Sequence, residues 1–503
     1  MYRMEKRFVL AVVVLFLAFS LPTLIRHEMW RDEIQTWGTV KGSDSISQLL
    51  SNKRYDGHPL LWYLGPFVLS RVTENPVSMQ MYHLFLATLS VWIFLEHAPF
   101  TRLQRVLFVF GYFPFYEFAI ISRDYAIGIL LLFLIAAFWS KRRDRFALLY
   151  LLLFLLAQTN LFGLLFACVF SGALFLEFLW IRWRKGTGPT WSCLALGMAW
   201  ILTGILVSAL EMMPPDDSGF AVGWNTRLSP ARAAISFSTV WKGFLPIPKP
   251  NLHFWNSNLL GTNKLQVLLS IPVYLLALVA LMRRPKSLAL FLAGSSLIFL
   301  FFYAKYLGYL RHHGHLYIFY ITCLWMSCKE QEVFLPVAFL DRISEVVDRW
   351  RNPGLLILFS VHAVCGFYAV GMDLKHPFSA SKRTGQWIAE RYGAETILVG
   401  DMHYTASAVA GHMDRPFYYP RGQRTGTYLI FDWTYQIQLE PEEVLKDALR
   451  IMKREKRPLL LVLSYDLEGI HVPNGIHLEL KEHFPPGIVP DETYYLYDLY
   501  EVR

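Results

Sequence analysis

Two adjacent carboxylates, Asp32 and Glu33, follow the first apolar segment of the chain. A carboxylate at the edge of an apolar environment can act as a general base, because desolvation raises its pKa, and it can also bind a cation. We therefore predict that Asp32 and Glu33 are catalytic, and that Glu33 is the candidate ligand of a divalent metal ion. The alternative is an acidic pair in a solvated loop.

His58 is followed by Pro59 and then by an apolar segment. Proline is favoured in the first turn of a helix, so His58 is expected at a helix N-terminus. An imidazole and free backbone N–H groups at such a terminus can bind an anion such as phosphate. We predict that His58 binds phosphate; the alternative is an interfacial histidine among aromatic side chains.

Arg123 also lies just before an apolar segment. A guanidinium binds phosphate oxygens through its planar fork of donors, so Arg123 is a second candidate for phosphate binding. The alternative is a structural ion pair with Glu117, six residues earlier.

Basic and imidazole side chains gather a third time between Lys305 and His315. Lys305, Arg311 and His312 are candidates for phosphate binding, and a loop-borne metal site is the alternative. His313 and His315 are two residues apart and do not share a helix face, which argues against a helix-borne pair of metal-binding histidines.

The elements that must position these residues are membrane helices. The chain has 503 residues, of which 54% are hydrophobic and 17% are charged, whereas soluble domains are about a quarter charged. Twelve segments are apolar enough to be candidate spans. They are Phe8–Ile25, Leu60–Val72, Met79–Glu96, Leu103–Ile120, Tyr125–Trp139, Phe146–Gln158, Leu161–Trp183, Ser192–Met212, Leu265–Met282, Ser287–Ala304, His315–Cys328 and Leu355–Met372.

Clusters of Lys and Arg lie between the apolar segments, at 141–145, 182–185 and 283–286. This spacing is typical of the positive-inside rule, so we attribute the net charge of +9 to topology and expect no nucleic-acid partner. Basic residues also precede the first apolar segment, which predicts a cytoplasmic N-terminus and a retained anchor in the cytoplasmic (inner) membrane.

With those clusters inside, loops 27–58 and 211–263 fall outside, together with Arg123 and the C-terminal part of the chain. Loop 211–263 is long enough to be a binding loop or a lid. The alternative is that the acidic turn at its start is only solvated and has no function. Three apolar segments separate the first loop from Arg123, although both must share a side. We therefore predict about eleven crossings, with one short segment between Leu60 and Ile120 either re-entrant or fused with a neighbour.

The chain after residue 373 loses its long apolar runs and contains no cysteine. We predict a membrane core over residues 1–373 and a soluble, extracytoplasmic α/β domain over residues 374–503. The predicted helices are Ala380–Tyr392 and Pro441–Lys456, and the predicted strands are Thr396–Gly400, Thr427–Asp432, Pro458–Ser464 and Thr493–Val502.

The order of these motifs resembles the GT-C superfamily of membrane glycosyltransferases. The resemblance is to the branch that contains protein O-mannosyltransferases and lipid A aminoarabinose transferases. Asp32 and Glu33 match the acidic motif of that branch's first loop, and His58-Pro59-Leu60 is similar to its His-Pro-Pro-Leu motif, with Leu60 in place of the second proline.

Two later motifs extend the resemblance over roughly the first 330 residues. Arg123-Asp124-Tyr125-Ala126 resembles an Arg-x-Tyr-Ala element, which adds Tyr125 to the predicted phosphate-binding residues. Arg311-His312, followed two positions later by glycine, is similar to an element of bacterial members.

The resemblance implies transfer of a hexosyl or pentosyl group, with inversion, from a polyprenyl-phosphate carrier to an acceptor on the outer face of the cytoplasmic membrane. Asp32 would act as the base, a divalent metal ion near Glu33 would assist, and the acceptor would be a glycan, a lipid or a protein. The partners would be the polyprenyl-phosphate sugar and membrane lipids.

Three other functions remain open at this point. A lipid or polysaccharide transporter would place charges near the middle of the membrane and often contains an internal repeat, which we do not find. A cell-envelope acyltransferase would need a buried catalytic histidine, for which His83 is the candidate. The last is a structural scaffold of the cell envelope.

Overall fold

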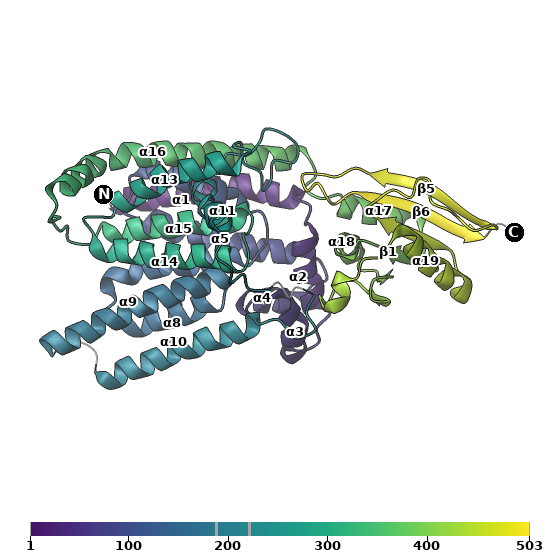
Figure 1. Ribbon diagram of the computed structural model, residues 1–503, viewed down its shortest axis with the longest axis horizontal. Helices are drawn as coiled ribbons and strands as arrows, with labels where there is room; N and C mark the ends of the chain where they lie inside the picture. The colour runs from purple at the N-terminus through teal and green to yellow at the C-terminus, as the bar shows by residue number, and fades with distance from the viewer. Residues whose placement is uncertain (1, 187–189, 220–222, 502–503) are drawn as a thin grey trace.

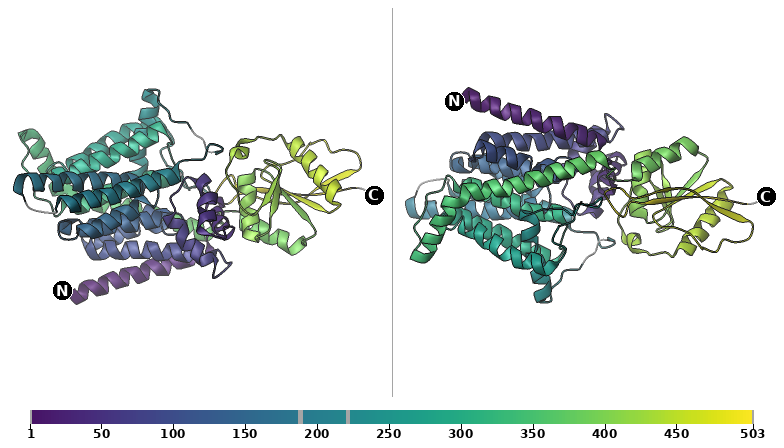
Figure 2. Two further views of the ribbon diagram at one scale, coloured as in Figure 1. Left: turned by 90° about the horizontal axis from the view of Figure 1, so that it is seen from below. Right: turned by 90° about the horizontal axis from the view of Figure 1, so that it is seen from above.

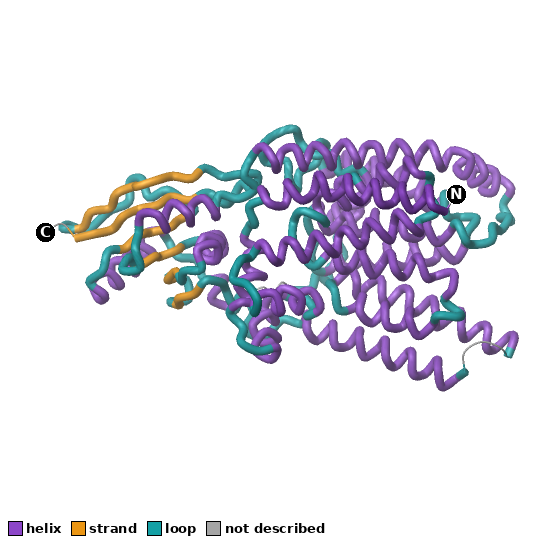
Figure 3. The backbone as a smooth tube through the Cα atoms, turned by 180° about the vertical axis from the view of Figure 1, so that it is seen from behind, coloured by secondary structure: helices purple, strands orange, loops and turns teal. Residues whose placement is uncertain are grey.

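A computed structural model describes residues 2–186, 190–219 and 223–501 of the chain. A bundle of helices forms one part, and a smaller sheet domain at one end of the bundle forms the other (Figure 1). Within the described residues, strands occur only in the sheet domain (Figure 3). We call the end of the bundle next to the sheet domain the domain end, and the opposite end the distal end.

The bundle is a multi-pass membrane assembly. Six helices in the described part of the chain are long and apolar enough to span a bilayer, and shorter apolar helices pack among them. We count eleven passes along the bundle within the described residues. In chain order they are α1 (Tyr2–Arg26), α5 (Val77–His97), α6 (Arg102–Val109) with η2 (Tyr112–Glu117), α7 (Tyr125–Phe138), α8 (Phe146–Ala157), α9 (Leu161–Lys185), α10 (Trp191–Met212), α13 (Asn263–Val279), α14 (Pro285–Ala304), α15 (Leu310–Ser327) and α16 (Ala338–Lys375).

Of the twelve predicted apolar segments, Leu60–Val72 is the one that does not cross the bundle. It forms α4 (Leu61–Ser70), whose ten residues reach about 15 Å, half the hydrocarbon thickness of a bilayer. Arg71 follows this helix and donates a hydrogen bond to the carbonyl of Val40, 3.0 Å away, and another to Ser43, both in the connection after α1. Both ends of α4 therefore lie at the domain end, as expected for a re-entrant segment.

The predicted segment Leu103–Ile120 crosses, but not as one helix. Its α-helix ends at Val109, and after Gly111 the chain forms the π-helical turn η2. A Cβ on Gly111 would lie 2.9 Å from the carbonyl oxygen of Phe108, and one on Gly366 of α16 would lie 2.4 Å from that of Phe110. The break thus coincides with a close approach of two backbones.

The predicted basic clusters meet at the distal end. Glu177 near the end of α9 forms ion pairs with Arg142 and Arg143 and lies 3.7 Å from Lys286. Arg283 pairs with Asp341 of α16 at 2.9 Å. The three clusters therefore share one end of the bundle, as the topology prediction requires.

Three short helices connect α1 to α5 at the domain end. Two of them, α2 (Arg31–Lys41) and α3 (Ile46–Lys53), lie between the bundle and the sheet domain (Figure 2), and the 3-10 turn η1 (Arg54–Asp56) leads into α4. Two further helices, α11 (Pro230–Phe237) and α12 (Thr239–Phe244), belong to the long connection before α13. The acidic turn predicted at the start of that connection covers residues 211–220, and its last residue, Phe220, lies outside the described residues.

The C-terminal domain is a six-stranded mixed sheet of order β3-β2-β1-β4-β6-β5. Strand β1 runs parallel to β2 and β4, and the outer pairs are antiparallel. The strands are β1 (Ile397–Gly400), β2 (Phe417–Tyr419), β3 (Arg424–Gly426), β4 (Leu459–Leu463), β5 (Ile476–Phe484) and β6 (Tyr494–Glu501).

Helices cover both faces of this sheet. Apolar residues of α17 (Ser381–Arg391) and α18 (His403–Met413) form a core on one face, and those of α19 (Pro441–Glu455) form a core on the other. All five residues of β4 are buried because its side chains contribute alternately to the two cores, which confirms the continuous apolar strand predicted there.

The sequence prediction was incomplete in this domain. It omitted α18, β2, β3 and β5, and its last strand ran to Val502, which lies outside the described residues. The strand predicted over Thr427–Asp432 is wrong. The backbone N–H of Leu429 donates to the side-chain oxygen of Gln35 at 3.0 Å, and the Gln35 amide donates to the Leu429 carbonyl at 2.7 Å. This segment therefore docks the sheet domain on α2 instead of extending the sheet.

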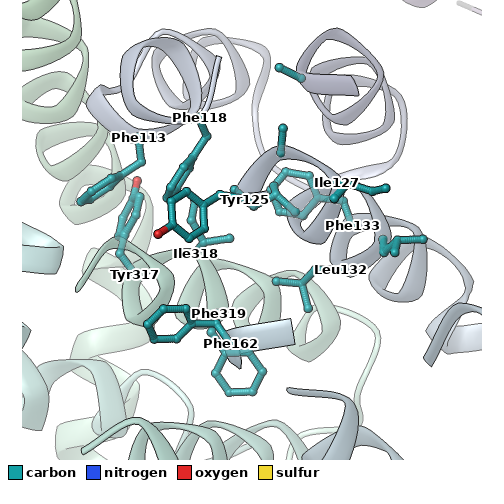
Figure 4. Close-up of a cluster of buried hydrophobic side chains, with 14 of the residues drawn as sticks. Phe113, Phe118, Tyr125, Ile127, Leu132, Phe133, Phe162, Tyr317, Ile318 and Phe319 are labelled. Atoms are coloured by element: carbon teal, nitrogen blue, oxygen red, sulfur yellow. The ribbon is translucent and has the colours of Figure 1, made fainter. Parts of the chain in front are cut away.

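Aromatic packing fixes the bundle near the domain end. The rings of Phe118 and Tyr125 are 5.7 Å apart, and Tyr125 lies 5.1 Å from His315. The ring of Phe113 lies 5.7 Å from Phe118 and 6.1 Å from Tyr317, and the close-up of this core draws these side chains together with Tyr125 (Figure 4). This packing holds the turn between η2 and α7, which carries Arg123.

Candidate active site

A cavity of about 190 Å³ lies between the bundle and the sheet domain. The bundle side contributes residues of α2, the segment before α4, and Arg123, and the sheet domain contributes the opposite side. The lining residues are Arg31, Asp32, Gln35, Thr36, Asp56, His58, Tyr63, Arg123, Tyr404, Ser407, Phe431 and Tyr435. Three of the predicted site residues, Asp32, His58 and Arg123, thus share one pocket.

Asp32 lies in this pocket between two arginines. Its Oδ2 atom is 3.2 Å from Arg123 Nη1 and 3.4 Å from Arg311 Nη2. Burial acts to raise the pKa of Asp32, but Arg123 and Arg311 outweigh it and hold the pKa below its ordinary value. The predicted increase in the basicity of this carboxylate by desolvation is therefore wrong for this geometry.

Arg311 is held among aromatic rings. Its guanidinium carbon lies 5.1 to 5.5 Å from the ring centres of Tyr309, Trp30 and Trp255, a favourable distance for cation–π attraction. Its Nε and Nη1 atoms are buried and donate to no described residue. Arg311 therefore stabilises Asp32 and has two further donors without a described acceptor, although it is not itself among the residues that line the cavity.

His58 orients Arg123. Arg123 Nη2 lies 3.3 Å from His58 Nε2, and Nδ1 of the same ring is 3.3 Å from the buried carboxylate of Asp124. Burial lowers the pKa of His58, with Arg123 acting in the same direction and Asp124 opposing it. A neutral ring that accepts from Arg123 and faces Asp124 through Nδ1–H fits this geometry.

The helix N-terminus predicted to bind phosphate already holds an anion of the protein. The backbone N–H of Leu60 donates to Glu211 Oε2 at 2.7 Å, and Lys53 lies 3.2 Å from the same oxygen. Glu211 thus occupies the position proposed for phosphate beside His58, and His58 contributes by positioning Arg123.

Glu33 points away from the pocket into a buried polar network. It accepts hydrogen bonds from the backbone of Ser122 at 2.6 Å and of Trp30 at 3.3 Å, and its Oε2 lies 3.0 Å from His27. The other side of His27 contacts Asp373 of α16 at 2.8 Å. Glu33 therefore ties α1, α2 and α16 to the segment that carries Arg123, and it is a positioning residue in this geometry.

The surroundings of Glu33 do not fit a metal site. Burial acts to lower the pKa of His27, but Asp373 and Glu33 outweigh it and raise the pKa to about 10, so a cation already fills this position. Among the described residues no group of three metal-ligating side chains has suitable geometry.

The other predicted phosphate-binding residues lie elsewhere. The hydroxyl of Tyr125 is 3.0 Å from His312 Nε2, and the Lys305 ammonium lies 5.2 Å from the ring centre of Trp224. None of the three is among the residues that line the cavity. The alternative pairing of Arg123 with Glu117 is also wrong, because Glu117 accepts from Trp255 at 3.1 Å and Arg123 pairs with Asp32.

Sequence reasoning missed Asp56 and the sheet-domain side of the cavity. Asp56 accepts a hydrogen bond from Tyr63 at 3.0 Å, and burial raises the pKa of Asp56 to about 7. Its place two residues before His58 was the available signal. Tyr404 and Tyr435 come from a domain without a recognisable motif, so only the docking of the two parts reveals them.

The fold is similar to that of ArnT from Cupriavidus metallidurans, in two solved states of that protein. With ArnT bound to undecaprenyl phosphate the TM-score is 0.51 at 13% identity, over 97% of each chain. With the apo state it is 0.55 at 13% identity, over 98% of each chain. No protein-family description matches the sequence, and no curated protein is detectably similar to it.

These matches cover both parts of the chain. They show that the chain shares the fold of ArnT, in which a helical membrane core is followed by a sheet domain.

Proposed function

We propose that the protein is a membrane glycosyltransferase that moves a sugar from a polyprenyl-phosphate carrier to an acceptor hydroxyl. The observation that carries the proposal is the carboxylate of Asp32 held by Arg123 and Arg311 in a pocket at the ends of membrane helices. Support also comes from the shared fold, since the similar ArnT was solved with undecaprenyl phosphate.

The proposed reaction is a single displacement. The acceptor oxygen forms a bond to the anomeric carbon while the bond from that carbon to the phosphate oxygen breaks, which inverts the configuration. Asp32 takes the acceptor proton, and the polyprenyl phosphate leaves with the bonding electrons. Arg123 and Arg311 stabilise the negative charge that develops on this leaving group, the role expected of preorganised donors.

Donor binding would also activate Asp32. Without a ligand the two arginines lower its pKa, so the carboxylate is charged but weakly basic. A phosphate that takes up the donors of Arg123 and Arg311 shares their positive charge. The carboxylate then becomes more basic when the donor is present, which couples proton transfer to donor binding.

The location of the pocket suits a lipid donor and a water-exposed acceptor. A polyprenyl chain can lie along the bundle while its phosphate reaches the domain end, and the sheet domain covers the pocket from the other side. Lys and Arg gather at the distal end, which supports a cytoplasmic distal end and an extracytoplasmic sheet domain.

Transfer from a labelled donor tests the proposal. Purified protein would receive a panel of undecaprenyl-phosphate-linked radiolabelled hexoses and pentoses with an extract of cell-envelope lipids and glycans, and label leaving the carrier would be counted. We expect transfer with at least one donor, loss of it in Asp32→Asn, and retention in Asp44→Asn, which changes an exposed acid of the same connection. Transfer that persists in Asp32→Asn would contradict the proposal.

A further inference from the structure

A second polar cavity, of about 310 Å³, lies at the domain end of the bundle. It is bounded by α12, by the connection that leads to α13, and by the start of α15. Tyr309 lines it, and the guanidinium of Arg311 lies 5.1 Å from the same ring. This cavity is therefore a neighbour of the first pocket, but it shares no lining residue with it.

Two lysines face this cavity without a carboxylate partner. Lys242 and Lys249 both line it, and neither forms an ion pair with a described residue. Lys242 is partly buried, and this burial lowers its pKa with no acidic group to oppose the effect. An ammonium group held out of water without a counter-charge favours binding of an anion.

Two residues that line this cavity also carry buried acceptors without a partner. His313 Nε2 lies 2.9 Å from the carbonyl of Leu307 and must donate to it, so Nδ1 is an acceptor in the neutral ring, and it is buried without a partner among the described residues. The Gln266 amide nitrogen donates to the Leu260 carbonyl. The side-chain oxygen of Gln266 is a second buried acceptor without a partner among the described residues.

We propose that this cavity binds the headgroup of a membrane lipid that carries a phosphate and a free hydroxyl, such as a glycerol phosphate or a sugar phosphate. Lys242 and Lys249 match the phosphate oxygens. His313 Nδ1 and the Gln266 oxygen need donors, which a phosphate lacks and a hydroxyl supplies. A ligand with both a phosphate and a hydroxyl can pair with the lysines and with the acceptors, whereas an inorganic anion alone leaves the acceptors without a donor.

Apolar side chains beside the cavity favour a lipid as the source of the phosphate. Leu259 is 55% exposed and Leu265 is 41% exposed, and each is adjacent in sequence to a lining residue, Leu260 or Gln266. Exposed leucines at the end of a membrane helix can contact acyl chains while the headgroup enters the cavity. The site does not depend on the proposed sugar transfer, because none of its residues lines the pocket of Asp32.

Binding of defined lipids to the detergent-purified full chain tests this site. Native mass spectrometry would measure the affinity for phosphatidylglycerol, for phosphatidylmethanol, which lacks the hydroxyls, and for phosphatidylcholine. The midpoint of thermal unfolding of the wild type would also be measured with each lipid, because this comparison needs no variant. Inorganic phosphate would be added as a competitor to distinguish free from lipid-borne phosphate.

We expect phosphatidylglycerol to bind about 10-fold more tightly than phosphatidylcholine and several-fold more tightly than phosphatidylmethanol. The double variant Lys242→Gln with Lys249→Gln should lose this preference, whereas Lys264→Gln, an exposed lysine at the start of α13, should keep it. Competition by phosphate at millimolar concentration would support the site with free phosphate as a second ligand, and resistance to it would support lipid alone.

Equal affinities for the three lipids in the wild type would overturn the proposal. So would an unchanged preference in the double variant, and equal binding of phosphatidylglycerol and phosphatidylmethanol would overturn the hydroxyl-bearing class of ligand. Sugar transfer in the assay described above is unaffected by any of these results.

Discussion

The carboxylate of Asp32 lies 3.2 Å from the guanidinium of Arg123, although 91 residues separate them in the chain. Arg123 Nη1 also donates to the backbone carbonyl of Asp32 at 3.1 Å. The arginine is thus fixed to the start of α2 by two contacts and to His58 by a third. A phosphate bound there would lie beside the proposed base.

Asp32→Asn should lower turnover by about 10²- to 10⁴-fold, the usual contribution of a general base. Affinity for undecaprenyl phosphate should be no weaker, because the amide leaves both arginines uncompensated. Turnover of the labelled donor and binding of undecaprenyl phosphate would be measured on the same preparation. A parallel loss of turnover and binding would point to a structural role for Asp32.

Arg123→Ala should weaken binding of undecaprenyl phosphate by about 10- to 100-fold, as expected for loss of a charged hydrogen bond. Arg123→Lys should recover only part of this loss, because an ammonium group cannot contact His58 and a phosphate through one planar fork. Binding isotherms of the two variants provide the measurement. Wild-type affinity in Arg123→Ala would place the donor phosphate elsewhere.

Asp56 should make donor binding depend on pH near neutrality. Burial raises the pKa of Asp56 to about 7, so acidification below pH 7 removes a negative charge from the pocket, and affinity for an anionic donor should rise as pH falls. Asp56→Asn should abolish this component. Affinities of both proteins for an undecaprenyl-phosphate sugar, a diester of constant charge, would be compared from pH 5.5 to 8.5. Parallel curves would exclude Asp56 as the titrating group.

His27 should make stability depend on pH in the alkaline range. Its pKa is raised to about 10 in the folded protein, from an ordinary value of 6.5, by Asp373 and Glu33 against the effect of burial. A raised pKa stabilises the fold fully below pH 6.5, and the contribution is lost as pH rises toward 10. Thermal unfolding in detergent should show this decline in the wild type.

His27→Gln serves as the matched variant for this prediction. It should be less stable than the wild type at pH 6, by about 3 kcal/mol, because two buried carboxylates lose their cation. Its midpoint should then vary less between pH 6.5 and 10. An identical decline in both proteins would assign the pH dependence to other groups.

The features of the fold that depend on local composition can be predicted from the sequence. Apolar runs predict the membrane helices, and the alternation of helices and strands predicts an α/β domain. The choice of α4 as the segment that does not cross is not visible in its composition. It depends on contacts of Arg71 with Val40 and Ser43, which form only after the chain has folded.

The candidate site is predictable in part for the same reason. The order of the motifs predicts that Asp32, His58 and Arg123 lie together, and the structure places all three in one cavity. The position of Glu33 is set by His27, which is held by Asp373, 346 residues later in the chain. A carboxylate that binds such distant partners looks the same in sequence as one that faces a pocket.

A structure of the protein with undecaprenyl phosphate tests the central claim most directly. We expect the phosphate within hydrogen-bonding distance of Arg123 and Arg311, beside Asp32, with the polyprenyl chain along the bundle. A structure in which no phosphate lies near Arg123 or Arg311 at saturating undecaprenyl phosphate would contradict this claim.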